Sequence, residues 1–150
     1  MKQISFQEKK DSPVGKRVRA VGMVYFRNED LIVGKMYSLK RQQMNPKDPN
    51  CVELVDRFQK PRAVLNRDVA SMISPLLDEN KIMNAECEVI EKAKWSRGDS
   101  QRPARAHRIR ISISLNDESD SVVKVFQDKL QRDYELFFFK SESRLSTLCK

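Results

Sequence analysis

The residues of this sequence best suited to a specific chemical role lie in one polar loop. The stretch YSLKRQQMNPKDPN, residues 37–50, leads from an alternating basic strand into a loop with two prolines and two asparagines. Asp48 lies in this loop between Lys47 and Pro49. Its carboxylate is a hydrogen-bond acceptor in a basic surrounding. Asparagine and aspartate side chains also bond their own backbone, so a structural role for the loop stands beside a functional one.

A second stretch with chemical potential is VGMVYF, residues 21–26. Gly22 within a strand permits close approach of another chain, because it carries no side chain. Tyr25 and Phe26 offer flat faces on which unpaired bases can stack. Since successive strand residues point to opposite sides, we expect one of these rings in the core and the other at the surface.

Catalytic chemistry has little support in the sequence. The single histidine, His107, stands at the start of an alternating strand, where we expect a surface or strand-end residue. There is no glycine-rich phosphate loop and no close cluster of acids. Three cysteines, Cys51, Cys87 and Cys149, are far apart and favour thiols over a disulfide framework or a zinc site. We therefore expect no enzyme, no metal and no cofactor.

The charge favours a polyanion as partner. Lysine and arginine number 29 against 21 acids, a net charge of +8, so nucleic acid is the first candidate and an anionic membrane surface the second. Residues 92–110 carry 7 basic groups and 1 acid. This region contains a basic loop whose candidate phosphate ligands are Lys94, Arg97, Arg102 and Arg105.

The sequence shows no pattern of a transmembrane segment or of a secretory signal peptide. No apolar run is long enough to span a bilayer, and the first residues lack the apolar core of a signal peptide. We expect no membrane partner and no small-molecule substrate. The cysteine usage indicates a reducing, intracellular location, and for a protein that binds DNA the nucleus.

The periodicity of apolar residues predicts a mainly β fold. Strand patterns cover residues 16–26, 35–42, 50–57, 61–66, 81–95 and 106–115. Helical spacing covers residues 66–80, with Asn66 as N-cap, and residues 121–137, capped by Asp120 or Ser119. About six short strands favour an OB-like barrel with one inserted helix and one C-terminal helix. The expected domain spans residues 16–138, between a flexible basic tail at 1–15 and a C-terminal tail at 139–150.

The two motifs together resemble the HIRAN domain, which is found at the N-terminus of a fork-remodelling translocase. That family has a glycine, an apolar residue and an aromatic pair on one strand, and about twenty residues later a leucine–x–arginine strand entering an asparagine–proline–x–aspartate–x–asparagine loop. The matching positions of this second motif are Leu39, Arg41, Asn45, Pro46, Asp48 and Asn50. The resemblance covers roughly residues 16–138.

The resemblance implies an OB-like barrel that holds the 3′ end of single-stranded DNA. Tyr25 would stack on the terminal base, and Asp48 would accept a hydrogen bond from the terminal 3′-hydroxyl. A carboxylate repels phosphate, so it selects a free hydroxyl at that position. Further nucleic-acid contacts are expected from Gly22, Phe26, Lys40, Arg41, Asn45, Lys47, Asn66 and Arg67.

Three functions fit these observations. The first is a non-catalytic module for single-stranded DNA in replication or repair at the fork, working with a helicase, translocase or nuclease. The second is an RNA-binding OB-type barrel, because stacking tolerates either sugar. The third is a protein-interaction adaptor that kept the fold and lost the end pocket. It is motivated by Val24 and Lys47, which stand where the family has a basic residue and an aromatic one.

Overall fold

The structure is a computed structural model that describes residues 2–10, 13–21, 31–42, 48–92, 94–95, 104–117 and 119–139. Its strands are β1 Lys2–Gln7, β2 Arg19–Val21, β3 Met36–Arg41, β4 Val52–Val55, β5 Pro61–Leu65, β6 Ile82–Glu91, β7 Lys94–Trp95, β8 Ala104–Arg105, β9 His107–Leu115 and β10 Glu135–Phe139. Its helices are the short 3-10 helix Val14–Lys16, α1 Arg67–Asp78 and α2 Ser121–Asp133.

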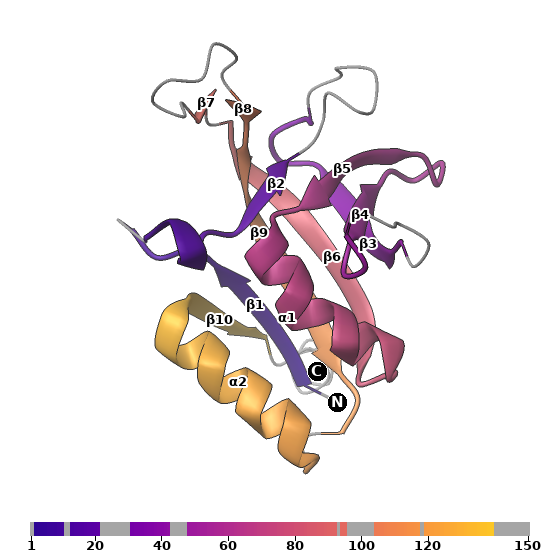
Figure 1. Cartoon of the computed structure of the whole chain (residues 1–150), viewed down its shortest axis with the longest axis vertical. Helices are drawn as coiled ribbons and strands as arrows, with labels where there is room; N and C mark the ends of the chain where they lie inside the picture. Colours follow the sequence, from indigo (N-terminus) through magenta and orange to yellow (C-terminus); the bar gives the residue numbers. More distant parts are fainter. Residues whose placement is uncertain are drawn as a thin grey trace, which may run out of the picture.

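Antiparallel strands close into a barrel. The main sheet has the order β10-β1-β9-β2-β5-β4-β3-β6, and pairing of β9 with β6 joins its two sides. Within the described residues the closed barrel therefore contains the six strands β9, β2, β5, β4, β3 and β6, with α1 inserted between β5 and β6 (Figure 1). The predicted OB-like barrel with two helices is confirmed.

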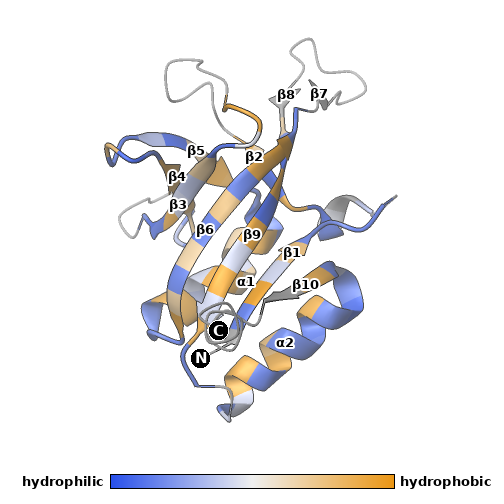
Figure 2. Ribbon diagram, turned by 180° about the vertical axis from the view of Figure 1, so that it is seen from behind, coloured by the Kyte–Doolittle hydropathy of each residue, from blue (hydrophilic) through white to orange (hydrophobic). Residues whose placement is uncertain are grey.

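Strand β9 is the central element of the sheet. Its first residues pair with β2, as Ala20 lies opposite His107, and its later residues pair with β1, as Phe6 lies opposite Ile111. Along its other side it pairs with β6. Hydrophobic and hydrophilic residues alternate along β6 and β9 (Figure 2). This alternation sends one set of side chains into the core and leaves the polar set outside.

The expected flexible tail over residues 1–15 is wrong for its first part. Residues 2–7 form β1, which lies between β9 and β10. Ile4 and Phe6 are fully buried, because the short pattern KQISFQ alternates polar and apolar residues like the barrel strands. The domain therefore begins with β1, well before residue 16.

The C-terminal helix is shorter than predicted. Helix α2 ends at Asp133, because Tyr134 takes an extended backbone with φ −131° and ψ 163°. The next residues form β10 and pair with β1. At the other end, Asp120 caps α2 by accepting hydrogen bonds from the backbone nitrogens of Val122 and Val123, as predicted.

Candidate nucleic-acid interface

Half of the residues expected to contact nucleic acid can be placed. Gly22, Tyr25, Phe26, Asn45, Lys47, Arg97 and Arg102 lie outside the described residues. The structure places Lys40, Arg41, Asp48, Asn66, Arg67, Lys94 and Arg105. Their positions show how the β3–β4 loop, the two ends of α1 and the β7–β8 hairpin are held.

Asp48 is part of an ordered turn. Its carboxylate oxygen Oδ1 accepts a hydrogen bond from the backbone nitrogen of Asn50 at 3.1 Å, and its carbonyl accepts one from the nitrogen of Cys51 at 3.1 Å. The side chain of Asn50 accepts a hydrogen bond from the Ser74 hydroxyl on α1 at 3.1 Å. The turn fixes this half-buried carboxylate before any ligand arrives.

Arg41 fixes the loop to the helix. Its guanidinium makes a bidentate pair with Asp78, at 2.9 and 3.1 Å, and donates to the carbonyls of Cys51 at 2.8 Å and Pro49 at 2.9 Å. These bonds occupy most of its N–H donors, and the side chain is only 13% exposed. Arg41 therefore connects the end of β3, the loop and the C-terminus of α1, and few of its donors remain for a phosphate.

Lys40 points to the other side of the same strand. It is exposed and donates a hydrogen bond to Gln59 in the hairpin between β4 and β5. Successive residues of a strand face opposite sides, which explains why two neighbouring cations have different partners. Of this pair, Lys40 is the one placed where a phosphate can approach.

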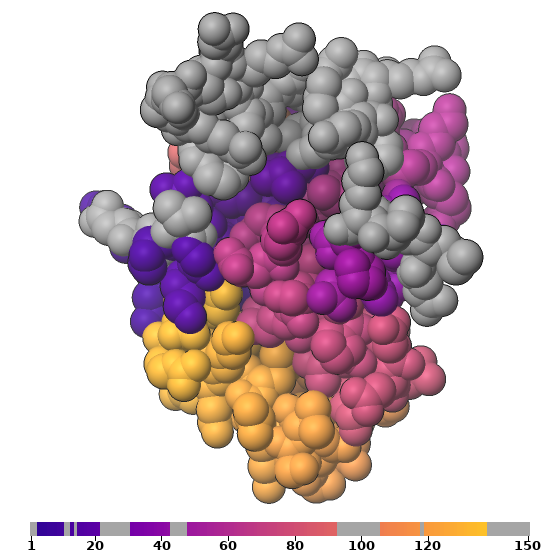
Figure 3. Space-filling view, in the orientation of Figure 1, coloured from indigo at the N-terminus to yellow at the C-terminus, as the bar shows by residue number. Residues whose placement is uncertain are grey.

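Asn66 and Arg67 lie at the N-terminal end of α1, away from the Asp48 turn. The Asn66 amide does not cap the helix: it accepts from the nitrogen of Arg19 at 3.0 Å and donates to the carbonyl of Arg17 at 2.8 Å. Arg67 is exposed. Ser74, which bonds the loop, follows Arg67 by roughly 10 Å along the helix axis. Arg67 and the Asp48 turn are therefore separated along α1, which lies near the middle of the view in Figure 3.

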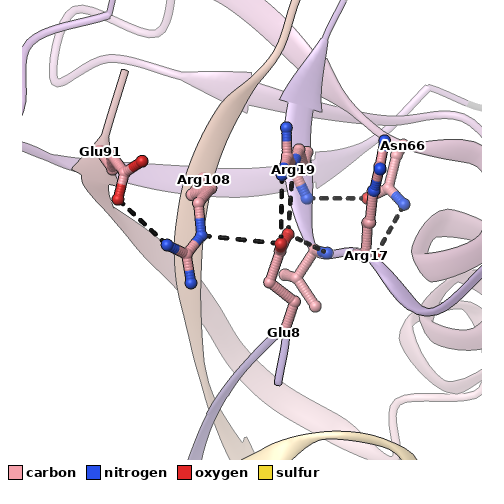
Figure 4. A network of polar contacts seen from close by, with 7 residues as sticks. Glu8, Arg17, Arg19, Asn66, Glu91 and Arg108 are labelled. Atoms are coloured by element: carbon pink, nitrogen blue, oxygen red, sulfur yellow. Dashed lines mark hydrogen bonds and ion pairs between the residues drawn. The ribbon is translucent and has the colours of Figure 1, made fainter. Parts of the chain in front are cut away.

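The buried carboxylate of Glu8 binds two arginines. The Glu8 carboxylate accepts from the nitrogen of Val18 at 3.2 Å, from Arg19 at 3.1 and 3.2 Å, and pairs with Arg108 at 3.6 Å. Arg108 also pairs with Glu91 at 3.0 Å (Figure 4). The network ties the end of β1 to β2, β9 and β6. Two cations counted in the net charge of +8 therefore have structural partners.

A second buried acid shapes the β4–β5 hairpin. Asp56 accepts hydrogen bonds from the nitrogens of Phe58 at 2.8 Å and Lys60 at 3.0 Å, and from the Arg62 guanidinium at 3.0 Å. Gln59 takes the left-handed backbone, φ +66°, that turns the chain. The residues of this tip were not among the predicted contacts, although DRFQKPR combines an acid, an aromatic residue and several cations.

We expect the order of this tip to depend on pH. The backbone hydrogen bond from Lys60, followed by those from Phe58 and Arg62, holds the pKa of Asp56 below its ordinary value. A lowered folded-state pKa means that the stabilisation is present at neutral pH and is lost as the pH falls through that pKa. The amide NMR signals of Phe58 and Lys60 should shift together in one acid titration.

An Asp56→Asn variant is the control for this titration. It keeps an acceptor oxygen and removes the ionisable group, so the two amide signals should no longer move between pH 5 and about 2. Signals of Phe58 and Lys60 that titrate unchanged in this variant would contradict the assignment to Asp56.

The β7–β8 hairpin continues β6 and β9 beyond the barrel. Lys94 lies opposite Arg105 in its register, and Trp95 lies opposite Ala104. In Figure 1 this hairpin stands above β2, at the end of the barrel from which the chain enters α1. The predicted basic loop, from Lys94 to Arg105, thus begins in β7 and ends in β8.

Groups with catalytic chemistry are sparse in the described part of the chain. His107 is the first residue of β9, so the predicted strand-end position is confirmed, but the alternative surface position is wrong, because the residue is buried opposite Ala20. Burial raises the pKa of the Cys87 thiol, which keeps it protonated. The described residues hold no group of three metal-ligating side chains and no helix long and apolar enough to cross a membrane.

Two solved structures are similar to this chain. The crystal structure of the HIRAN domain of human HLTF superposes with a TM-score of 0.56 and 17% identity, over 77% of this chain and 84% of that one. The NMR structure of the HLTF HIRAN domain gives 0.54 and 16%, over 85% of this chain and 97% of that one. The chain has the fold of a HIRAN domain.

The similarity to the HIRAN domain concerns the fold. No protein-family model matches the chain, and a search of curated proteins finds no match. The resemblance inferred from the two motifs is confirmed at this level, and it extends over most of the HIRAN domain. Of the β3–β4 loop, which carries the more specific motif, the structure describes residues 48–51, and these are held by the hydrogen bonds of Asp48 and Arg41.

Proposed function

We propose that this chain is a non-catalytic module that binds single-stranded DNA and recognises a 3′ end. The observation that carries the proposal is the Asp48 turn. On a HIRAN-like fold and in a chain of net charge +8, one carboxylate is held in place by its own loop. Such a group accepts a hydrogen bond from a terminal hydroxyl and repels a phosphate.

The positions of the described cations support a DNA strand that runs along α1, away from Asp48. Arg67 is exposed at one end of the helix, and the Asp48 turn packs against its other half. Helix α1 is 12 residues or about 18 Å long, enough for several nucleotides of the 4–16 that an OB fold covers. Lys40 and the β7–β8 hairpin add positive charge beyond this path.

The proposed setting is the repair or replication of DNA in the nucleus, with a helicase, translocase or nuclease as protein partner. A module that holds a 3′ end positions that end for an enzyme and needs no chemistry of its own. Stacking and phosphate contacts tolerate either sugar, so a competition between matched DNA and RNA strands separates this proposal from RNA binding.

The deciding experiment compares oligonucleotides with a 3′-hydroxyl and a 3′-phosphate by fluorescence anisotropy. We expect the hydroxyl form to bind at least tenfold tighter, because one charge-assisted hydrogen bond contributes about 1.5–3 kcal/mol. In Asp48→Asn the bond to the Asn50 nitrogen is kept and the negative charge is lost. The preference of this variant for the 3′-hydroxyl over the 3′-phosphate should fall to about twofold or less, while its thermal unfolding temperature stays that of the wild type.

Asp128→Asn is the matched control for charge. Asp128 is exposed on α2, so its substitution changes the net charge equally and should leave the preference intact. Equal affinity of the wild-type chain for both ends would refute end recognition. An absence of binding at about 50 mM salt, where phosphate contacts are strongest, would refute the DNA-binding function itself.

A further inference from the structure

The hairpin between β4 and β5 presents an aromatic ring to solvent. Phe58 is 68% exposed, and its ring centroid lies 5.0 Å from the guanidinium carbon of Arg57. A single exposed apolar residue is common on protein surfaces. A ring already stacked with an arginine is different, because both groups offer flat faces to an unpaired base.

The ring stands on a rigid support. Asp56 is buried at the base of the tip. Its carboxylate accepts hydrogen bonds from the backbone nitrogens of Phe58 and Lys60 and from the side chain of Arg62. Such a turn does not have to be ordered when a ligand binds, which lowers the entropic cost of binding. The tip therefore has the properties of a preformed platform.

The charge around the ring matches a nucleic acid. Four cations belong to the tip or contact it: Lys40, Arg57, Lys60 and Arg62. The carboxylate among them, Asp56, is paired with Arg62. The next acid along β4, Glu53, receives a hydrogen bond from Gln42. An aromatic face within a field of cations is the arrangement that binds single strands, with stacking for the base and lysines for the phosphates.

The tip is separate from the Asp48 turn and near enough to share a strand with it. Strand β4 connects the Asp48 turn to the β4–β5 tip and is ~13 Å long. Lys40, at the end of β3, contacts Gln59 of the tip, while its neighbour Arg41 contacts the loop around Asp48. Helix α1 and the hairpin are visible on the same face of the molecule (Figure 3).

From this geometry we infer a second contact for single-stranded DNA at the β4–β5 tip. A base several nucleotides before the 3′ end stacks on Phe58 beside Arg57, and Lys40 and Lys60 hold the adjoining phosphates. The inference rests on the proposed function and extends it, because it gives the module a footprint longer than its end pocket.

The test measures how Phe58→Ala affects oligonucleotides of different length. A 3′-hydroxyl oligonucleotide of about ten nucleotides should bind roughly five- to thirty-fold more weakly to the variant, the loss of one stacked base. One of about three nucleotides, which reaches the Asp48 turn alone, should bind the variant and the wild type within twofold. Phe58→Trp should restore the affinity for the longer strand.

Val125→Ala is the matched control, since Val125 on α2 is as exposed as Phe58 and should leave both affinities unchanged. Equal binding of the long strand by Phe58→Ala and the wild type would overturn the second contact and leave the end pocket standing. An equal loss for both lengths would also overturn it, because Phe58 would then belong to the end pocket. A wild-type chain that binds neither strand would refute the proposed function first.

Discussion

Glu8→Ala should lower the free energy of unfolding by about 3 kcal/mol, measured by denaturant titration of the isolated chain. The carboxylate is buried and lies between Arg19 and Arg108, whose side chains are themselves largely covered. Its removal leaves these cations without their counter-charge and the nitrogen of Val18 without an acceptor. Removal of one partner from a buried ion pair costs more than the pair contributes as a whole.

Two further variants separate charge from hydrogen bonding in this network. Glu8→Gln keeps an acceptor for the Val18 nitrogen and should lose less stability than Glu8→Ala. Glu91→Gln breaks the other pair of Arg108, but Glu91 is 57% exposed, so the cost should stay below about 1 kcal/mol. A Glu8→Ala chain that unfolds within 1 kcal/mol of the wild type would show that the arginines find other partners.

The barrel could be predicted because its strands alternate. In IRISISL, residues 109–115, the apolar residues Ile109, Ile111, Ile113 and Leu115 recur at every second position, and all are buried. Apolar residues at every second position indicate a strand with one buried face, so this strand could be predicted without knowledge of its neighbours in the fold. The change of period after Asn66 likewise predicted α1 correctly.

The two strands that extend the sheet gave a weaker signal. β1 contributes two large apolar residues, Ile4 and Phe6, to a polar and charged stretch. Only Tyr134 separates α2 from β10, and the sequence ELFFF of β10 fits a helix end as well as a strand. Their pairing with each other and with β9 is long-range, so no local pattern could predict it.

The roles of charged residues could not be predicted from composition. Arg41, Arg19 and Arg108 all count toward the basic excess, yet each has a carboxylate partner in the folded chain. Their partners Asp78 and Glu8 stand 37 and 11 residues away along the sequence. The motif around Asp48 could be found in the sequence because its residues are close together along the chain. The pair of Arg41 with Asp78, which holds the same loop, forms only when distant segments meet.

Phe6→Ala, in β1, should lower the free energy of unfolding by about 3–5 kcal/mol. Phe6 is fully buried and packs edge-to-face on Tyr134, with ring centroids 5.5 Å apart. Its removal leaves a cavity between β1, β9 and the end of α2, and the closed barrel limits how far its neighbours can move in.

Phe58→Ala provides the matched control, because it makes the same chemical change at a site that is 68% exposed. It should cost less than about 0.5 kcal/mol. Similar denaturation midpoints for the two variants would mean that β1 is not part of the cooperative unit. A large loss in Phe6→Ala alone would establish that a functional fragment must include residues 2–7. DNA-binding assays on a chain trimmed to residue 16 would then measure a destabilised barrel and would not test the proposed 3′-end contact at Asp48.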